Sequence, residues 1–266
     1  MSDSKNHPGS VQKIATIARN TFREAVRDRI LYNLVLFVLL ITAAAIFLGD
    51  LTGGHEIRTI INLGLGAMLI FGAFISIFVG VSLVSKEIEK RTLYAIFSKP
   101  IGRGEFIIGK YLGLCLTLLV NVLVMGVGIT LALLFVGGGK FAFSVWGTVF
   151  LIYLQLAILT AVAILFSSFS SPALSALLTF FVFLIGHFST TLRDLATNLG
   201  ATGARYFFSF LYYFLPNFSF FNFAANASKG EVPPPALLIG DLLYSVFYIG
   251  VLLAATVLIF SRRNFK

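Results

Sequence analysis

The side chains best suited to chemistry lie in one polar segment, residues 85–110, with the sequence SKEIEKRTLYAIFSKPIGRGEFIIGK. It carries six basic and three acidic side chains and lies between two long apolar runs. Behind the charges, apolar residues recur at near-helical spacing, at Ile88, Leu93, Ile96 and Phe97. Pro100 and the glycines after it then end this pattern, which predicts a short amphipathic helix followed by a turn. A short surface helix of this kind is suited to contacting a partner.

Residues 104–111, GEFIIGKY, nearly fit the phosphate-binding pattern G-x-x-x-x-G-K-[ST]. In that pattern the residue after the lysine offers a hydroxyl to magnesium from the start of a soluble helix, whereas Tyr111 opens an apolar run. We therefore expect no nucleotide to bind here. Lys110 is instead expected to reach from the start of a membrane span to the polar interface.

Other reactive side chains are too few or too scattered for a catalytic or metal site. Three histidines share no spacing typical of metal ligands: His7, His55 and His187. The single cysteine, Cys115, lies in an apolar run, which excludes an intrachain disulfide and a cysteine-based metal site. We predict no catalytic residue, metal or cofactor in this chain.

The composition predicts an integral membrane protein. Of 266 residues, 58% are hydrophobic and only 12% are charged, far outside the range of soluble globular proteins. The formal net charge of +9 does not indicate nucleic-acid binding, because the basic residues lie at the ends of apolar segments rather than in one cluster.

The apolar runs predict an all-α fold with six membrane spans, since a helix needs roughly 20 apolar residues to cross a ~30 Å hydrocarbon core. The spans are expected at residues 31–48, 59–84, 111–136, 145–166, 173–188 and 236–260. They follow a disordered leader, 1–10, and an amphipathic helix, 11–30, which is expected to lie in the membrane interface as an elbow. A cleaved secretory signal is not expected, because the apolar run begins only after about thirty residues.

The basic residues predict the topology. Fifteen of the 20 Lys and Arg residues lie near the two termini and in residues 85–110, and five lie on the opposite side. Because cytoplasmic loops are enriched in Lys and Arg, both termini and residues 85–110 are expected to be cytoplasmic.

The longest outer segment, 186–235, contains an aromatic stretch, YFFSFLYYFLPNFSFFNF, at 206–223. It predicts short interfacial or re-entrant helices broken at Pro216, because non-helical backbone at membrane depth must be covered by protein or water. These aromatic residues either form a belt at the headgroup level or line an outer exit. The residues that would line such an exit are Tyr206, Phe210, Tyr213, Pro216 and Asp241.

Asp241 lies about 9 Å along the last expected span. It is expected to pair with Arg193 or Arg205, either as a structural interface pair or on a transport pathway.

Small and polar residues within the spans predict helix contacts. Gly72, Ser76 and Gly80 repeat every four residues, a stripe that lets membrane helices approach closely. The facing helix belongs either to this chain or to a second copy. Further polar side chains within the spans are expected to form interhelical hydrogen bonds rather than ligand contacts: Asn62, Asn121, Gln155 and Thr160.

Residues 85–113 resemble the first cytoplasmic loop of ABC-2 type (type V exporter) permeases. In that family the loop runs as an acidic and basic stretch, Thr-Leu, an apolar patch, Pro, a basic residue and Gly-Lys at the third span. The matching residues are Glu87, Glu89, Lys90, Arg91, Thr92, Leu93, Ile96, Phe97, Pro100, Arg103, Gly109 and Lys110. Arg91 departs from the pattern, since many relatives have Gly before Thr-Leu. The elbow, six spans and outer segment extend the resemblance over a single transmembrane domain, 11–266.

The resemblance implies a multi-pass permease subunit of a bacterial inner-membrane transporter. It would pair with a second copy or a paralogue and bind two cytoplasmic ABC ATPase subunits, which would hold the ATP and Mg. Residues 85–110, the coupling segment, would act as a coupling helix held by the ATPase. The expected contact residues are Glu87, Ile88, Glu89, Lys90, Arg91, Thr92 and Leu93.

Two functions remain open. One is export of a hydrophobic or amphipathic substrate, driven by ATP hydrolysis on the separate subunit. The other is a non-transporting membrane anchor that couples an ATPase to a partner protein. An intramembrane enzyme is not expected, because the expected spans hold no cluster of polar catalytic residues.

Overall fold

The computed structural model describes residues 9–25, 56–89, 102–191, 194 and 202–262, together with positions 36, 37, 40, 41, 43 and 47; for residues 83–89, 202 and 204 only the backbone is described. These residues form helices and contain no strand. The helices are α1 (Ser10–Ala25), α3 (Glu56–Glu89), α5 (Arg103–Phe135), α6 (Ala142–Ser167), α7 (Pro172–His187), α9 (Thr202–Phe214), α10 (Ala224–Ala227) and α11 (Pro235–Arg262), with short 3-10 turns η2 (Gly139–Phe141) and η3 (Phe218–Phe221).

Four of the described helices are long and apolar enough to cross a membrane. They cover Glu56–Ser82, Arg103–Phe135, Gly139–Ser167 and Pro235–Arg262, and so match the second, third, fourth and sixth expected spans. The fifth expected span is the shorter apolar helix α7, of 16 residues. Most of the first expected span lies outside the described residues, although Phe37 is buried and its ring meets Phe71 of α3 edge-on, with ring centroids 6.1 Å apart.

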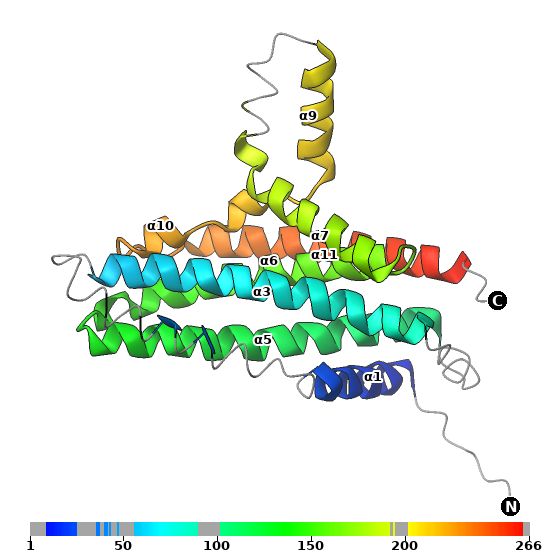
Figure 1. Cartoon of the computed structure of the whole chain (residues 1–266), viewed down its shortest axis with the longest axis horizontal. Coiled ribbons are helices and arrows are strands. Elements are labelled where there is room, and N and C mark those ends of the chain that lie inside the picture. The colour runs from blue at the N-terminus through cyan, green and yellow to red at the C-terminus, as the bar shows by residue number, and fades with distance from the viewer. Residues whose placement is uncertain are drawn as a thin grey trace, which may run out of the picture.

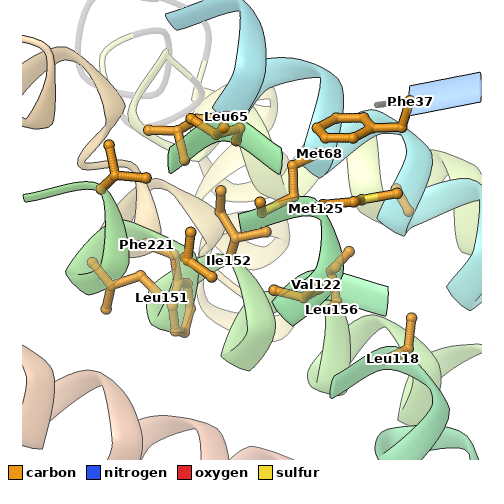
Figure 2. Packing of buried hydrophobic residues seen from close by; sticks show 14 of the residues in the cluster. Phe37, Leu65, Met68, Leu118, Val122, Met125, Leu151, Ile152, Leu156 and Phe221 are labelled. Atoms are coloured by element: carbon orange, nitrogen blue, oxygen red, sulfur yellow. The ribbon is translucent and has the colours of Figure 1, made fainter. Parts of the chain in front are cut away.

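The long helices run side by side in one bundle, and α6 lies at its centre (Figure 1). Side chains from α3, α5 and α6 meet in the core, where η3 adds Phe221 (Figure 2). The fully buried members include Leu65, Met68, Met125, Leu151 and Leu156. Because α6 is covered on nearly all sides, even its polar residues Thr148, Gln155 and Thr160 are buried.

The stripe at Gly72, Ser76 and Gly80 lies against α6 of the same chain. A Cβ atom at Gly80 would lie 2.9 Å from the Cβ of Ala163, and one at Gly72 would collide with the Leu156 side chain. The Ser76 hydroxyl donates a hydrogen bond to the Leu156 carbonyl at 3.5 Å. Small residues therefore allow α3 to approach the central helix closely.

The turn between α5 and α6 is determined by a glycine. Gly137 has φ +80°, a left-handed conformation that favours glycine. Its N–H donates to the Leu134 carbonyl and the Gly138 N–H donates to the Leu133 carbonyl, at 3.2 and 2.7 Å. This pair of bonds is the Schellman motif, which satisfies carbonyls left open at a helix end.

The polar segment is more helical than the sequence predicted. The helix α3 continues to Glu89, and α5 begins at Arg103 rather than at residue 111. The expected turn is therefore wrong at Gly104, which lies in the first turn of α5. Charged residues are tolerated inside α5 because they have partners on neighbouring helices, as described below.

In the outer segment, α9 ends at Phe214, two residues before Pro216. It projects sideways from the bundle, whereas η3 returns to it (Figure 1). The return is close, because a Cβ atom at Gly186 of α7 would lie 2.6 Å from both the Pro216 carbonyl oxygen and the Phe218 ring.

The close contact of α3 with α6 predicts that Gly72→Ala destabilises the protein. The added methyl group collides with the fully buried Leu156, and such overpacking costs about 1–3 kcal/mol. We expect a lower melting temperature in detergent. The matched control is Gly250→Ala in α11, where a Cβ atom has no neighbour within 4 Å. Equal melting temperatures for the two variants would contradict the close contact.

Candidate functional site

The candidate site is the charged end of the bundle, where α3 ends, α5 begins and α11 ends, with α1 beside them (Figure 1). Side chains from α1 and the start of α5 meet there in ion pairs and hydrogen bonds. We call this set the charged junction; its members are Lys13, Glu24, Arg103, Glu105 and Lys110.

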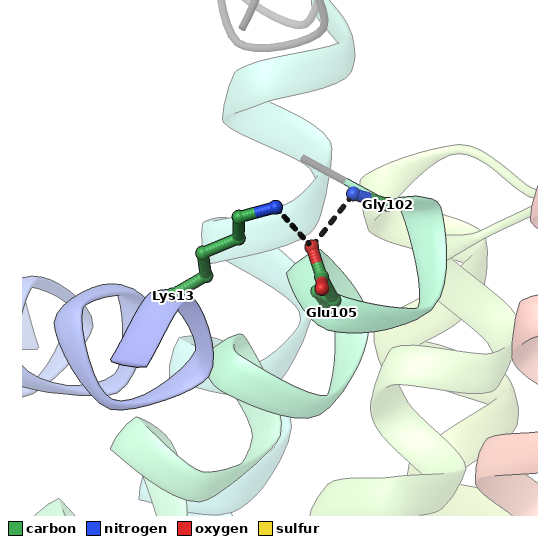
Figure 3. A network of polar contacts seen from close by, with 3 residues as sticks. All are labelled: Lys13, Gly102 and Glu105. Atoms are coloured by element: carbon green, nitrogen blue, oxygen red, sulfur yellow. Dashed lines mark hydrogen bonds and ion pairs between the residues drawn. The ribbon is translucent and has the colours of Figure 1, made fainter. Parts of the chain in front are cut away.

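Glu105 ties the first turn of α5 to α1 (Figure 3). Its Oε2 atom accepts a hydrogen bond from the Gly102 backbone N–H at 2.8 Å and lies 3.8 Å from the Lys13 Nζ atom. A carboxylate in the first turn of a helix also interacts favourably with the positive end of the helix dipole. The start of α5 is thus held by its own side chain and by α1.

Arg103 ties the start of α5 to the end of α11. Its Nη1 atom donates to the backbone carbonyls of Phe260, at 3.2 Å, and of Ser261. Both carbonyls belong to the last turn of α11, where they have no intrahelical partner. Arg103 thus caps the C-terminal end of α11 and joins two helices that are far apart in the sequence.

The helices α1 and α5 also lie in close contact further along α5, at Gly109 and Gly113. A Cβ atom at Gly109 would lie 2.7 Å from the Ile17 Cβ atom, and one at Gly113 would lie 2.6 Å from the Ala18 carbonyl oxygen. The expected elbow helix thus contacts α5 along one face; its position in a membrane interface stays a prediction.

Lys110 does not reach the surface as the sequence predicted. It is 4% exposed, its Nζ atom lies 3.6 Å from a Glu24 carboxylate oxygen, and the same atom lies 5.8 Å from the centre of the Phe106 ring. The earlier start of α5 explains the difference, because it places Lys110 two turns inside the helix, under α1. A buried cation needs such a partner.

This arrangement holds the coupling segment at both ends. Glu87, Ile88 and Glu89 are the last residues of α3, so their backbone continues the helix that contacts α6. At the other end, Arg103 belongs to the charged junction and the Gly102 N–H donates to Glu105. The other expected contact residues, Lys90, Arg91, Thr92 and Leu93, lie outside the described residues. A force applied to this segment would therefore reach α3 and α5 through rigid helices.

The structure does not bring the expected outer-exit residues together. Tyr206, Phe210 and Tyr213 lie on α9 and are 73%, 60% and 83% exposed. Pro216 is buried beside α7, and Asp241 is buried in α11. They therefore do not form one site in the described part of the chain.

Asp241 has no ion pair with Arg205 within the described residues, and Arg193 lies outside them. Its Oδ2 atom is buried and has no hydrogen-bond partner in this part of the chain. The expected pairing with Arg205 is therefore absent from the described structure.

The polar side chains of the spans form hydrogen bonds of two kinds, within a helix and between helices. Asn121 and Thr160 donate to carbonyls of their own helices, at 2.7 and 2.8 Å, so the interhelical bonds expected for them are wrong. Gln155 does bond across helices: its Nε2 atom lies 3.3 Å from the Nδ1 atom of His187 on α7. Sequence spacing cannot separate these cases, because a side chain four residues after a carbonyl always has that acceptor nearby.

Sequence reasoning missed the residues that anchor the outer segment. The Tyr244 hydroxyl accepts from the Asn217 N–H at 3.0 Å, and the Tyr248 hydroxyl donates to the Phe214 carbonyl at 2.9 Å. These tyrosines are four residues apart on α11, a spacing that could have indicated one shared face.

The ion pair between the buried Lys110 and the half-exposed Glu24 predicts that Glu24→Gln destabilises the protein. It leaves Lys110 buried without its carboxylate, and we expect a loss of about 1–2 kcal/mol, between the values for surface and buried pairs. Adding Lys110→Met should restore the melting temperature. Arg19→Gln, an exposed change on the same helix, is the control. If the double variant melts below Glu24→Gln alone, the pairing account is wrong.

Comparison with known proteins gives one family. The family model described as "ABC-2 family transporter protein" matches residues 15–265. No curated protein matches the chain significantly.

Proposed function

Because this chain belongs to the ABC-2 family of transporter proteins, we propose that it is the permease subunit of an ATP-driven exporter of a hydrophobic or amphipathic substrate. A separate ATPase subunit would bind and hydrolyse ATP, and the coupling segment would be its docking site on the permease. The assembly would contain two ATPases and two permease chains, in a bacterial inner membrane with both permease termini in the cytoplasm.

The continuity of α3 is the observation that supports this proposal most directly. One helix extends from the core contact at Gly72 and Gly80 to Glu89 in the coupling segment. A helix transmits a push or a turn along its length far better than a loop would. The charged junction fixes the other end of the segment through Arg103 and Glu105, so movement of an ATPase would act on α3 and α5 together.

The charges of the segment suit a docking role. Glu87 and Glu89 directly precede Lys90 and Arg91, so two acidic and two basic groups lie within five residues. Charge pairs of this kind fix the register of a docked helix and the choice of partner more than they raise affinity. Apolar residues behind them, such as Ile88 and Leu93, would supply the buried area.

The proposal predicts that reversing both acidic charges, Glu87→Lys with Glu89→Lys, releases the ATPase. Like charges placed across an interface cost several kcal/mol, so recovery of the ATPase with the tagged chain should fall at least about tenfold. Recovery is measured by mild-detergent pull-down with proteomic identification and an ATPase assay. Glu231→Lys, an exposed charge reversal in the segment before α11, is the control and should leave recovery unchanged.

Equal recovery of the ATPase with the wild type and the double variant would refute docking through these residues. Recovery of the ATPase without ATP-dependent movement of any amphipathic probe in vesicles would instead favour the anchor function.

A further inference from the structure

A cavity of about 110 Å³ lies in the half of the bundle far from the charged junction, between α3, α6, the end of α7 and the segment after η3. Its apolar walls include Leu65, Ile152 and Phe221. Five polar side chains also line it: Asn62, Thr148, Gln155, His187 and Asn222. None of the described residues lining it is Asp, Glu, Lys or Arg.

The polar groups of the cavity come from four parts of the chain and converge on one space. Gln155 and Thr148 are buried on α6, whereas Asn62 and Asn222 are exposed at the rim. The amide of Gln155 is held by the His187 ring at 3.3 Å, which orients it from the side of α7. Several fixed donors and acceptors in a mostly apolar pocket are typical of a ligand site.

The size of the cavity limits what it can hold. Pockets for drug-sized ligands are about 300–1,000 Å³, so this one is too small for such a molecule. A water occupies about 30 Å³ of liquid, and the cavity is therefore large enough for a compact polar group equal to a few waters. Its described lining residues carry no formal charge, so they offer hydrogen bonds but no counter-ion.

An exposed apolar row leads away from this cavity along α3. From Asn62 and Gly66 at the cavity, positions four residues apart continue the row as Ile70, Phe74 and Phe78, which are 54%, 46% and 60% exposed. Side chains at this spacing are neighbours on a helix. The last two rings are stacked, with centroids 6.1 Å apart and an interplanar angle of 11°.

The row is about 18 Å long, because each of the 12 steps from Gly66 to Phe78 rises about 1.5 Å along the helix. The row runs towards the charged end of the bundle. The polar cavity and the apolar row together are complementary to an amphipathic molecule that has one polar head and one apolar tail.

We propose that this cavity binds the uncharged, hydroxyl- or amide-bearing head of an amphipathic substrate, while the substrate's alkyl chain lies along Ile70, Phe74 and Phe78. The proposal rests on the proposed function and narrows its substrate class. We expect a charged head to bind more weakly, because no described lining residue is a counter-ion and an unpaired charge in a mostly apolar pocket is unfavourable.

The test uses the full chain in phosphatidylcholine nanodiscs and N-(2-hydroxyethyl)dodecanamide, whose small uncharged head carries one amide and one hydroxyl, with a photoreactive diazirine in its tail. Labelled peptides are mapped by mass spectrometry. We expect label on the 70–78 stretch of α3, displaced by the unlabelled amide but not by dodecyl phosphate at the same concentration. The joint change Asn62→Leu with Asn222→Leu should reduce this label about fivefold or more, since loss of one neutral hydrogen bond costs about that factor.

A second variant and a control keep the result independent of folding. Gly66→Leu fills the mouth of the cavity at a position where a Cβ atom has no neighbour within 4 Å, and it should reduce the label equally. Asn226→Leu, outside the cavity, should keep the wild-type label. Unchanged labelling in both cavity variants, or labelling of α11 to the same extent as α3, would overturn the site. Equal displacement by dodecyl phosphate would overturn the uncharged-head assignment.

These outcomes are separable from those of the proposed function. The photolabelling needs neither ATP nor an ATPase, so cavity-dependent labelling without ATPase recovery would support the site and count against the transporter assignment. Recovery of the ATPase together with labelling that the cavity variants do not change would support the transporter assignment and count against the site.

Discussion

The close contact between α3 and α6 is the constraint on which the described bundle depends. Hydrophobic burial gives little drive for helix association inside a bilayer, so packing and interhelical hydrogen bonds must hold the helices together. Gly72 and Gly80 allow the two backbones to approach, and Ser76 adds a hydrogen bond at the same contact. Because α6 also contacts α5, α7 and α11, the position of α3 is defined relative to the whole bundle.

The charged junction connects this core to the coupling segment. Charged residues in membrane helices are costly unless they pair, and here they pair between α1 and α5 while Arg103 closes the end of α11. Residues 90–101 therefore follow the continuous helix α3 and precede the start of α5, which the charged junction holds against α1 and α11. In the function proposed above, this arrangement would receive the mechanical input of an ATPase.

Sequence reasoning predicted the helical class and four of the spans, because long apolar runs have few alternatives in a membrane. It also identified the small-residue stripe, since spacing of four residues defines a helix face. It misplaced the start of α5 and the exposure of Lys110, because the ion pair with Glu24 depends on a contact between distant segments. The bond between Gln155 and His187, and the cavity beside it, likewise come from tertiary packing.

The most direct test of the account is chemical crosslinking from the end of α3. A Glu89→Cys variant, made after replacing the buried native Cys115 by Ser, is treated with a thiol-to-amine crosslinker in membranes containing the whole assembly. Glu231→Cys, at the opposite end of the bundle, serves as the comparison. The account predicts that an ATPase is captured from position 89 and not from position 231. Capture from position 231, or no capture from position 89 in an assembly that hydrolyses ATP, would contradict it.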